Sequence, residues 1–216
     1  MPELPEVETS VQAIQEFTNQ NIESIEIYNP NLRWKVDCKA FKNLCGLKVD
    51  KISRRAKYIL LHIDKSQILI HLGMTGTLRI AEKNSNFYKK HDHVEFIFQS
   101  GKLIFNDPRR FGSMHYITKP SSHFLLEKLG PEPLSEEFNG DYLFQKIKKS
   151  FSPIKNTLMN QHNVVGIGNI YANEILFDAK IRPTRKSKTI TKKEHHKIAA
   201  SAKKILKIAI NAGGTT

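Results

Sequence analysis

Apolar residues recur along the chain with two different periods, and the change of period divides the sequence. After a helical stretch at residues 7–18, short runs rich in β-branched and aromatic residues follow one another, and several are separated by hairpin-length turns such as 64–66 and 99–101. The predicted strands are 22–28, 49–53, 58–63, 67–72, 77–81, 93–98, 102–106 and 112–117. This part of the sequence predicts a β-sandwich or barrel with one added helix.

From Ser121 onward the apolar positions follow a helical period, and Gly130-Pro131-Glu132-Pro133 punctuates the change. Helices are predicted at 138–149, 153–159, 168–178 and 192–211, with Thr191 as the N-cap of the last. The fold class is therefore predicted as α+β. We place an N-terminal β-sandwich domain at residues 1–132 and an all-helical domain at residues 133–216.

The charge of the chain is concentrated in the helical part. Of the net charge of +13, residues 142–216 carry +12, from 15 Lys and Arg against 3 Asp and Glu. Such a density of positive charge favours a phosphate-rich nucleic acid as partner. An anionic membrane surface is the competing partner, but the last helix only partly fits the amphipathic pattern that it requires.

The rest of the sequence excludes several classes of protein. No run approaches the roughly 18 apolar residues of a membrane span, and the start of the chain, MPELPEVETS, is unlike a secretory signal. Cys38 and Cys45 suit neither a disulfide framework nor a four-ligand zinc site. We expect a cytoplasmic protein with reduced, structural cysteines.

The first residues carry the candidate chemistry. Removal of Met1, expected because Pro2 is small, leaves a secondary amine that is partly unprotonated at neutral pH. Attack of this amine on a sugar C1′ gives a cationic iminium that acidifies the C2′ protons, and Glu3 and Glu6 are carboxylates able to move protons nearby. Alternatively, both glutamates simply favour the N-terminus of the first helix through its dipole.

Several blocks of sequence, in order along the whole chain, identify a family. They are Met1 to Thr9, Arg54 to Tyr58, His71 to Gly76, Lys90 to His93, Asp107 to Gly112, Leu129 to Leu134 and Val165 to Glu174. Together they resemble the formamidopyrimidine-DNA glycosylase (Fpg/Nei) family. The resemblance implies a base-excision repair enzyme that removes oxidised purines, namely 8-oxoguanine and formamidopyrimidines, and then cleaves the abasic strand as a lyase. The implied partner is double-stranded DNA containing oxidised bases or abasic sites. The resemblance also implies a monomeric cytoplasmic protein of bacterial type, associated with the nucleoid.

The same resemblance implies roles for individual residues. Pro2 matches the Schiff-base nucleophile, Glu3 the acid that protonates the sugar, and Lys57 a lysine assigned to phosphate contact and to proton donation during elimination. The matched DNA-contacting positions are His71, His91, Lys155 and Asn169, of which Asn169 opens the second helix of a helix-two-turn-helix domain. Without the motifs, Lys57 would be read as a solvated strand-end lysine and His71 as a core histidine.

A further implied group fills the space left by a flipped base. Extrusion of a base costs a few kcal/mol; Met74 and Phe111 are apolar groups that can enter the stack, and Arg109 can donate to the orphaned cytosine. Alternatively, Met74 and Phe111 are ordinary core residues and Arg109 is an ordinary surface residue. This set resembles the Fpg branch of the family and so favours an oxidised purine opposite cytosine.

The sequence departs from the family in two places. Ser150 stands where well-known relatives carry a DNA-contacting lysine, and the chain stops at Thr216, where relatives continue into a four-cysteine zinc finger. We therefore expect no metal or other cofactor in this chain. Three functions stay open: an active glycosylase and lyase, a catalytically impaired remnant that only binds DNA, and, more remotely, a terminal-proline tautomerase.

Overall fold

The computed structural model describes residues 1–85, 88–118 and 123–214, and these fall into two compact units. Unit 1 comprises Met1–Pro2 and Val7–His123, and unit 2 comprises Glu3–Glu6 and Phe124–Thr216. Ser121, where the sequence predicts the change of period, lies outside the described residues. The changeover at His123 precedes the predicted boundary at residue 132, and the assignment of Glu3–Glu6 to unit 2 was not predicted.

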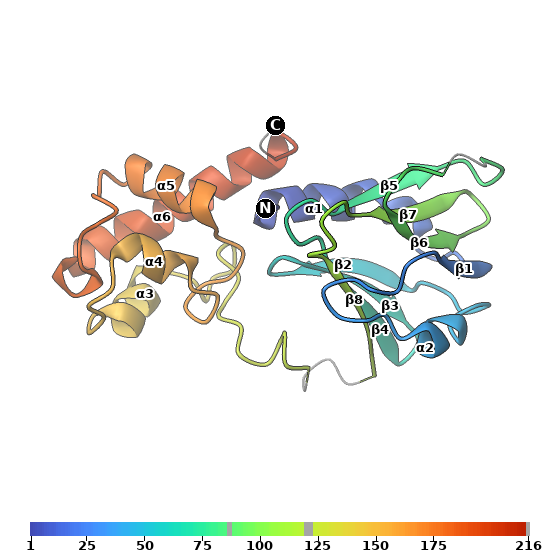
Figure 1. The fold of residues 1–216 in the computed structure, drawn as a ribbon. Coiled ribbons are helices and arrows are strands. Elements are labelled where there is room, and N and C mark those ends of the chain that lie inside the picture. Colours follow the sequence, from blue (N-terminus) through green and yellow to red (C-terminus); the bar gives the residue numbers. More distant parts are fainter. Residues whose placement is uncertain (86–87, 119–122, 215–216) are drawn as a thin grey trace. The chain divides into compact units, whose positions relative to one another are not determined.

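The described part of unit 1 contains two four-stranded antiparallel sheets (Figure 1). The first has the order β1-β6-β7-β5 and the second the order β2-β3-β4-β8. The strands are β1 (Ser24–Ile27), β2 (Lys51–Arg55), β3 (Tyr58–Ile63), β4 (Ser66–His71), β5 (Thr77–Ala81), β6 (Asp92–Ile97), β7 (Lys102–Asn106) and β8 (Ser113–Ile117). Each coincides with a predicted strand to within two residues at either end.

Both sheets contribute to one hydrophobic core, which makes unit 1 a sandwich. Alternation places Ile59 and Leu61 of β3 in this core together with Phe96 of β6 and Phe105 of β7. In the register of β3 and β4, Ile59 pairs with Ile70 and Leu61 with Ile68, so these positions share one face. The predicted β-sandwich is therefore confirmed.

Helical segments complete unit 1 and differ in detail from the prediction. The predicted helix at 7–18 is α1 (Leu4–Ala13), followed by the short 3-10 helix η1 (Gln15–Phe17). A short helix, α2 (Cys38–Lys42), was missed because five residues are too few to show a period, although Asp37 caps it by accepting from the N–H of Ala40 at 3.0 Å. Val7 and Val11 of α1 pack in the core of unit 1.

Unit 2 is helical, as predicted. Its elements are α3 (Gly140–Ile147), α4 (Ile154–Met159), α5 (Asn169–Asp178), the 3-10 helix η3 (Ser187–Thr189) and α6 (Lys192–Asn211). Thr191 caps α6 through a capping box with Glu194, which confirms the predicted N-cap. A separate core joins the four α-helices through residues such as Leu143, Leu158, Ile175 and Ile198.

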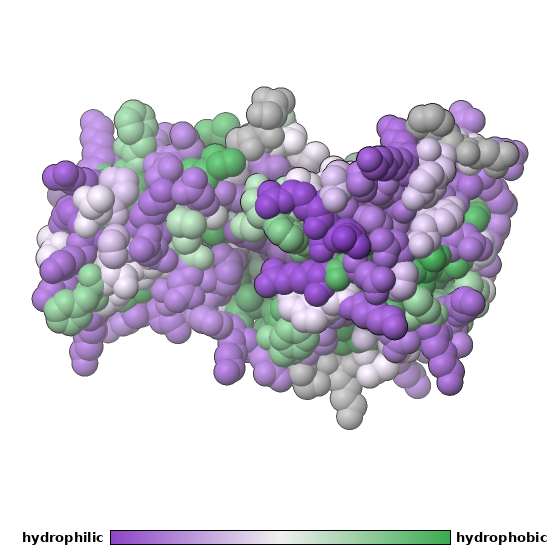
Figure 2. All heavy atoms as spheres, viewed as in Figure 1, coloured by the Kyte–Doolittle hydropathy of each residue, from purple (hydrophilic) through white to green (hydrophobic). Residues whose placement is uncertain are grey.

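Hydrophilic side chains cover most of the surface seen in Figure 2, and apolar side chains gather in small patches. Large apolar side chains that are exposed include Met74, Phe111, Phe151 and Phe177. Within the described residues, no helix combines the length and apolar character that a membrane span requires.

Candidate active site

A cavity of 710 Å³ in unit 1 brings the start of the chain together with two loops. Its lining consists of Met1, Asn31, Leu32, Arg33, His71, Gly73, Met74, Arg109, Arg110 and Phe111. Met1 is 55% exposed, and the nitrogen of the partly buried Pro2 is joined to it by a peptide bond. Removal of Met1 would therefore leave the free amine of Pro2 at this cavity.

The two loops approach each other closely at Gly73. This residue has φ +65°, and a Cβ there would lie 2.5 Å from the carbonyl carbon of Phe111. The buried carboxylate of Asp107 holds the same loops: it accepts from the hydroxyl of Thr75 at 2.6 Å and from the N–H of Gly112 at 2.8 Å. Asp107 thus organises the cavity, a role that the sequence alone did not reveal.

The three residues predicted to fill the space of a flipped base lie on these loops. Met74 is 44% exposed and Phe111 43%, which is unusual for large apolar side chains. The guanidinium carbon of Arg109 lies 4.6 Å from the centre of the Phe111 ring, in a cation–π contact. Met74 and Phe111 are therefore not core residues.

His71 ends β4 beside the cavity. Its Nδ1 accepts from the N–H of Gly73 at 3.1 Å, so the ring proton is assigned to Nε2. Burial, followed by the charges of Lys57, Arg33 and His115, lowers the pKa of His71 to about 4. His71 is therefore a neutral hydrogen-bond donor at pH 7. Lys57, in the turn between β2 and β3, is only 7% exposed and so differs from a solvated strand-end lysine.

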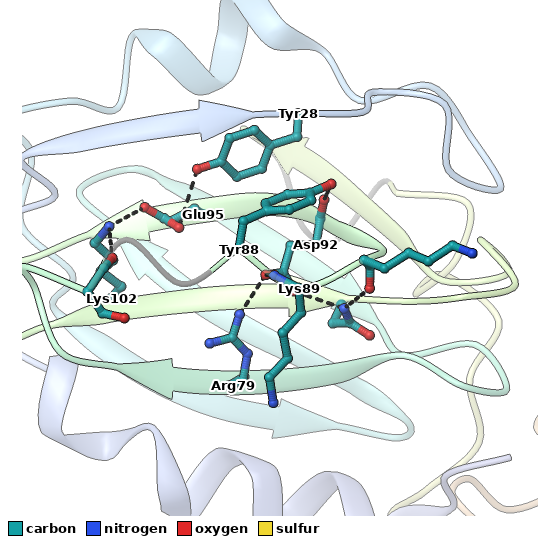
Figure 3. A network of polar contacts seen from close by, with 10 residues as sticks. Tyr28, Arg79, Tyr88, Lys89, Asp92, Glu95 and Lys102 are labelled. Atoms are coloured by element: carbon teal, nitrogen blue, oxygen red, sulfur yellow. Dashed lines mark hydrogen bonds and ion pairs between the residues drawn. The ribbon is translucent and has the colours of Figure 1, made fainter.

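A polar network on the β1-β6-β7-β5 sheet holds the loop that carries His91 (Figure 3). Buried Asp92 accepts from the guanidinium of Arg79 at 2.5 Å, from the N–H of Lys89 at 2.9 Å and from the side-chain amide of Asn106 at 2.8 Å. The N–H of Asp107 donates to the carbonyl of His91 at 3.1 Å, and His91 adopts φ +74°. The loop is thus fixed on both sides of this strained residue.

The outer part of the same network involves Glu95. The Nζ of Lys102 lies 2.9 Å from its carboxylate, and the hydroxyl of Tyr28 donates to it at 3.4 Å. The Tyr28 and Tyr88 rings make an edge contact with centres 5.2 Å apart. Figure 3 shows these residues together with the ion pair of Arg79 and Asp92.

In unit 2, the carboxylate of Glu3 lies at the N-terminus of α5. It is 2% exposed and accepts from the N–H of Gly168 at 2.6 Å, of Ile170 at 2.9 Å and of Tyr171 at 3.3 Å. The first amides of a helix have no partners within it and are suited to an anion. Glu3 supplies that anion from the chain itself.

Glu6 supports Glu3 from one helical turn away. One of its oxygens accepts from the N–H of Glu3 at 2.8 Å, and the other accepts from the hydroxyl of buried Tyr171 at 2.8 Å. The N–H of Leu4 also donates to the carbonyl of Gly166 at 3.0 Å. The segment that follows Pro2 is thus held by hydrogen bonds from both its backbone and its side chains.

The glycines before α5 allow a close approach of the N-terminal segment. A Cβ on Gly168 would lie 2.5 Å from Cδ of Glu3, and one on Gly166 would lie 2.6 Å from the side chain of Leu4. Here these glycines make room for the chain's own N-terminal segment. Asn169 is the exposed first residue of α5, as predicted.

Lys155 belongs to α4, and its N–H donates to the carbonyl of Pro183 at 3.3 Å. Unit 2 therefore contains Glu3, Glu6, Lys155 and Asn169, whereas the other predicted site residues lie in unit 1. The peptide bond between Pro2 and Glu3 links the two sets. Among the described residues, no group of three or more His, Cys, Asp or Glu could hold a metal ion.

Comparisons with known proteins agree on one family. Residues 1–114 match the model of the formamidopyrimidine-DNA glycosylase N-terminal domain, and residues 129–216 match the model of the formamidopyrimidine-DNA glycosylase H2TH domain. A formamidopyrimidine-DNA glycosylase of Hydrogenovibrio crunogenus is 48% identical over 100% of this chain and 78% of its own length. One from Legionella pneumophila is 49% identical over 100% of this chain and 80% of its own length.

Solved structures show the same similarity. The Lactococcus lactis enzyme bound non-covalently to DNA with an abasic site has a TM-score of 0.91 and 36% identity, over 99% of this chain and 83% of that one. A mutant of the same enzyme bound to DNA containing Fapy-dG has a TM-score of 0.92 and 36% identity, over 100% of this chain and 80% of that one.

Proposed function

The chain belongs to the formamidopyrimidine-DNA glycosylase family of base-excision repair enzymes, and on that premise we propose that it removes oxidised purines from DNA and cleaves the resulting abasic site through Pro2. The observation that carries the proposal is the cavity that Met1 shares with Met74, Arg109 and Phe111. It puts the amino end of the chain beside the side chains best suited to open a duplex.

The proposed reaction begins when the free Pro2 nitrogen attacks C1′ of the damaged nucleotide. The glycosidic bond breaks, the base leaves with a proton, and the ring oxygen is protonated as the iminium forms. Loss of a C2′ proton then expels the 3′-phosphate by β-elimination, and water finally hydrolyses the iminium to free the enzyme. Each step needs the amine to be positioned rather than merely present.

Glu3 and Glu6 support this chemistry by fixing the chain next to the nucleophile. Both oxygens of Glu3 accept backbone N–H groups of α5, and Glu6 holds the N–H of Glu3 itself. We assign Glu3 the proton transfer to the sugar oxygen that the family implies, with Glu6 as a positioning residue. Lys57, buried at the turn before β3, is assigned to phosphate contact and proton donation in the elimination.

Duplex opening is assigned to the two loops joined at Gly73. Met74 and Phe111 occupy the space that the flipped nucleotide leaves, which recovers part of the stacking energy of a few kcal/mol. Arg109, stacked on Phe111, donates to the acceptors of the orphaned cytosine. His71, His91, Lys155 and Asn169 are assigned to the DNA backbone, with His71 donating through Nε2.

The experiment is an incision assay on three end-labelled duplexes, which contain 8-oxoguanine opposite cytosine, a pre-formed abasic site opposite cytosine, or no lesion. The proposal predicts release of free 8-oxoguanine and cleavage of both damaged duplexes, with the undamaged duplex left intact. Binding of the damaged duplexes without base release or cleavage would support a DNA-binding remnant and contradict the proposal.

A further inference from the structure

Arg33 lines the cavity but belongs to none of the motifs that identify the family. It lies on the segment between β1 and α2, and its side chain is exposed. Its N–H donates to the carbonyl of Gly112 at 3.1 Å, which ties this segment to the loop that carries Arg109 and Phe111. A third segment of unit 1 therefore presents a cation at the cavity.

The Arg33 guanidinium contacts Trp34, which is the first of a row of three aromatic rings. Its central carbon lies 4.6 Å from the centre of the Trp34 ring, which lies 5.4 Å from His115, and His115 lies 5.2 Å from His123. Burial and His123 lower the pKa of His115 to about 4, so the ring beneath Trp34 carries no charge at neutral pH. Stacking fixes the plane of the guanidinium and reduces the entropy that binding would otherwise cost.

The charge of Arg33 also reaches His71. Together with burial and Lys57, it favours the neutral form of that histidine. A phosphate that accepts a hydrogen bond from neutral His71 receives no positive charge from the imidazole. The charges of Lys57 and Arg33, which lower the pKa of His71, are close enough to that residue to help neutralise such a phosphate.

We propose that Arg33 binds a phosphate of the DNA backbone at the cavity, beside the phosphate assigned to His71. The inference rests on the proposed function and extends its DNA-binding surface by one residue. A phosphate is favoured over a base because Arg33 lies on a different segment from Arg109, the residue assigned to the base, and because its charge acts on His71, which is assigned to a phosphate. The planar fork of arginine matches a phosphate in two parallel hydrogen bonds.

The test measures equilibrium binding of a duplex containing a tetrahydrofuran abasic analogue, which undergoes no cleavage, at several salt concentrations. Arg33→Gln should weaken binding about tenfold and reduce the magnitude of the slope of log K against log salt by about 0.9. Both effects should be the same opposite cytosine and opposite adenine. Arg33→Lys should retain the slope, because it retains the charge.

Lys35→Gln is the matched control, since Lys35 is an exposed cation of the same segment that does not line the cavity. The inference would be overturned if the salt slope of Arg33→Gln equalled that of the unmodified chain or of Lys35→Gln. It would also be overturned if the loss of affinity depended on the base opposite the abasic analogue. Because the analogue is never cleaved, this result is independent of Pro2. A changed slope together with a failed incision assay would support the Arg33 site and reject the proposed enzyme.

Discussion

The carboxylate of Glu3 accepts the N–H of Gly168 at 2.6 Å, across 165 positions of sequence. This bond, with those from Ile170 and Tyr171, makes Glu3 the N-terminal cap of α5, a helix whose own N-cap residue, Gly168, has no side chain to offer. The residue that follows Pro2 therefore has a fixed position through the start of a helix in unit 2. Glycine is required at 168 because any side chain would meet this carboxylate.

Glu3→Gln should destabilise the protein by about 1–3 kcal/mol, because one oxygen that accepts a backbone N–H becomes a donor that faces a donor. Glu6→Gln is the comparison. Its amide can donate to the Tyr171 hydroxyl while its oxygen still accepts from the N–H of Glu3, so the loss should be smaller. Urea unfolding measures both, and equal losses, or a larger loss for Glu6→Gln, would contradict the capping role of Glu3.

Much of the fold was predictable from the sequence, because alternation and helical period report which face of each element is buried. Strands such as β3, β5 and β7 and helix α6 have the predicted bounds. The site was predictable only through family motifs. The contact of Glu3 with α5 is long-range and leaves no local pattern, and the role of Asp107 depends on two loops meeting at Gly73. The same holds for Arg33, because its segment is joined to the loop of Phe111 by a long-range hydrogen bond, from the N–H of Arg33 to the carbonyl of Gly112.

Arg109→Ala should relax the preference for cytosine opposite the lesion. A good hydrogen-bonded base contact carries about 1–3 kcal/mol of discrimination, which corresponds to at least a fivefold loss of preference. Excision rates on 8-oxoguanine opposite cytosine and opposite adenine give the ratio. Arg110→Ala is the control from the same loop and should leave the ratio unchanged. If Arg109→Ala keeps the ratio within twofold, Arg109 does not read that base.

Phe111→Ala should impair excision of an intact lesion more than cleavage of a pre-formed abasic site, because an abasic site has no base to extrude. We expect a loss of excision of about tenfold, since base–aromatic stacking contributes about 1–3 kcal/mol. Tyr116→Ala removes an aromatic side chain of similar exposure, 37% against 43%, from the same unit. Equal impairment of both reactions by Phe111→Ala, or of either by Tyr116→Ala, would contradict the assignment.

His71 should make the folded protein sensitive to acid. Its pKa is lowered from 6.5 to about 4 in the folded protein, so between these values the unfolded chain binds the extra proton. The free energy of unfolding should therefore fall as the pH falls from 6.5 to 4. His71→Asn can keep an acceptor for the N–H of Gly73 without the titration, and should show a weaker fall in urea unfolding at pH 7 and pH 4.5. An unchanged pH dependence would show that His71 titrates normally.

The central claim is that the nitrogen of Pro2 is the nucleophile, and borohydride trapping tests it most directly. The chain lacking Met1 is incubated with an abasic duplex and borohydride, and the covalent complex is digested and analysed by mass spectrometry. We expect one reduced sugar adduct on the Pro2 nitrogen, and no such adduct on Pro2 when Met1 is retained, because that nitrogen is then a tertiary amide. An adduct on a lysine such as Lys57 with Pro2 unmodified, or no adduct in the presence of bound DNA, would contradict it.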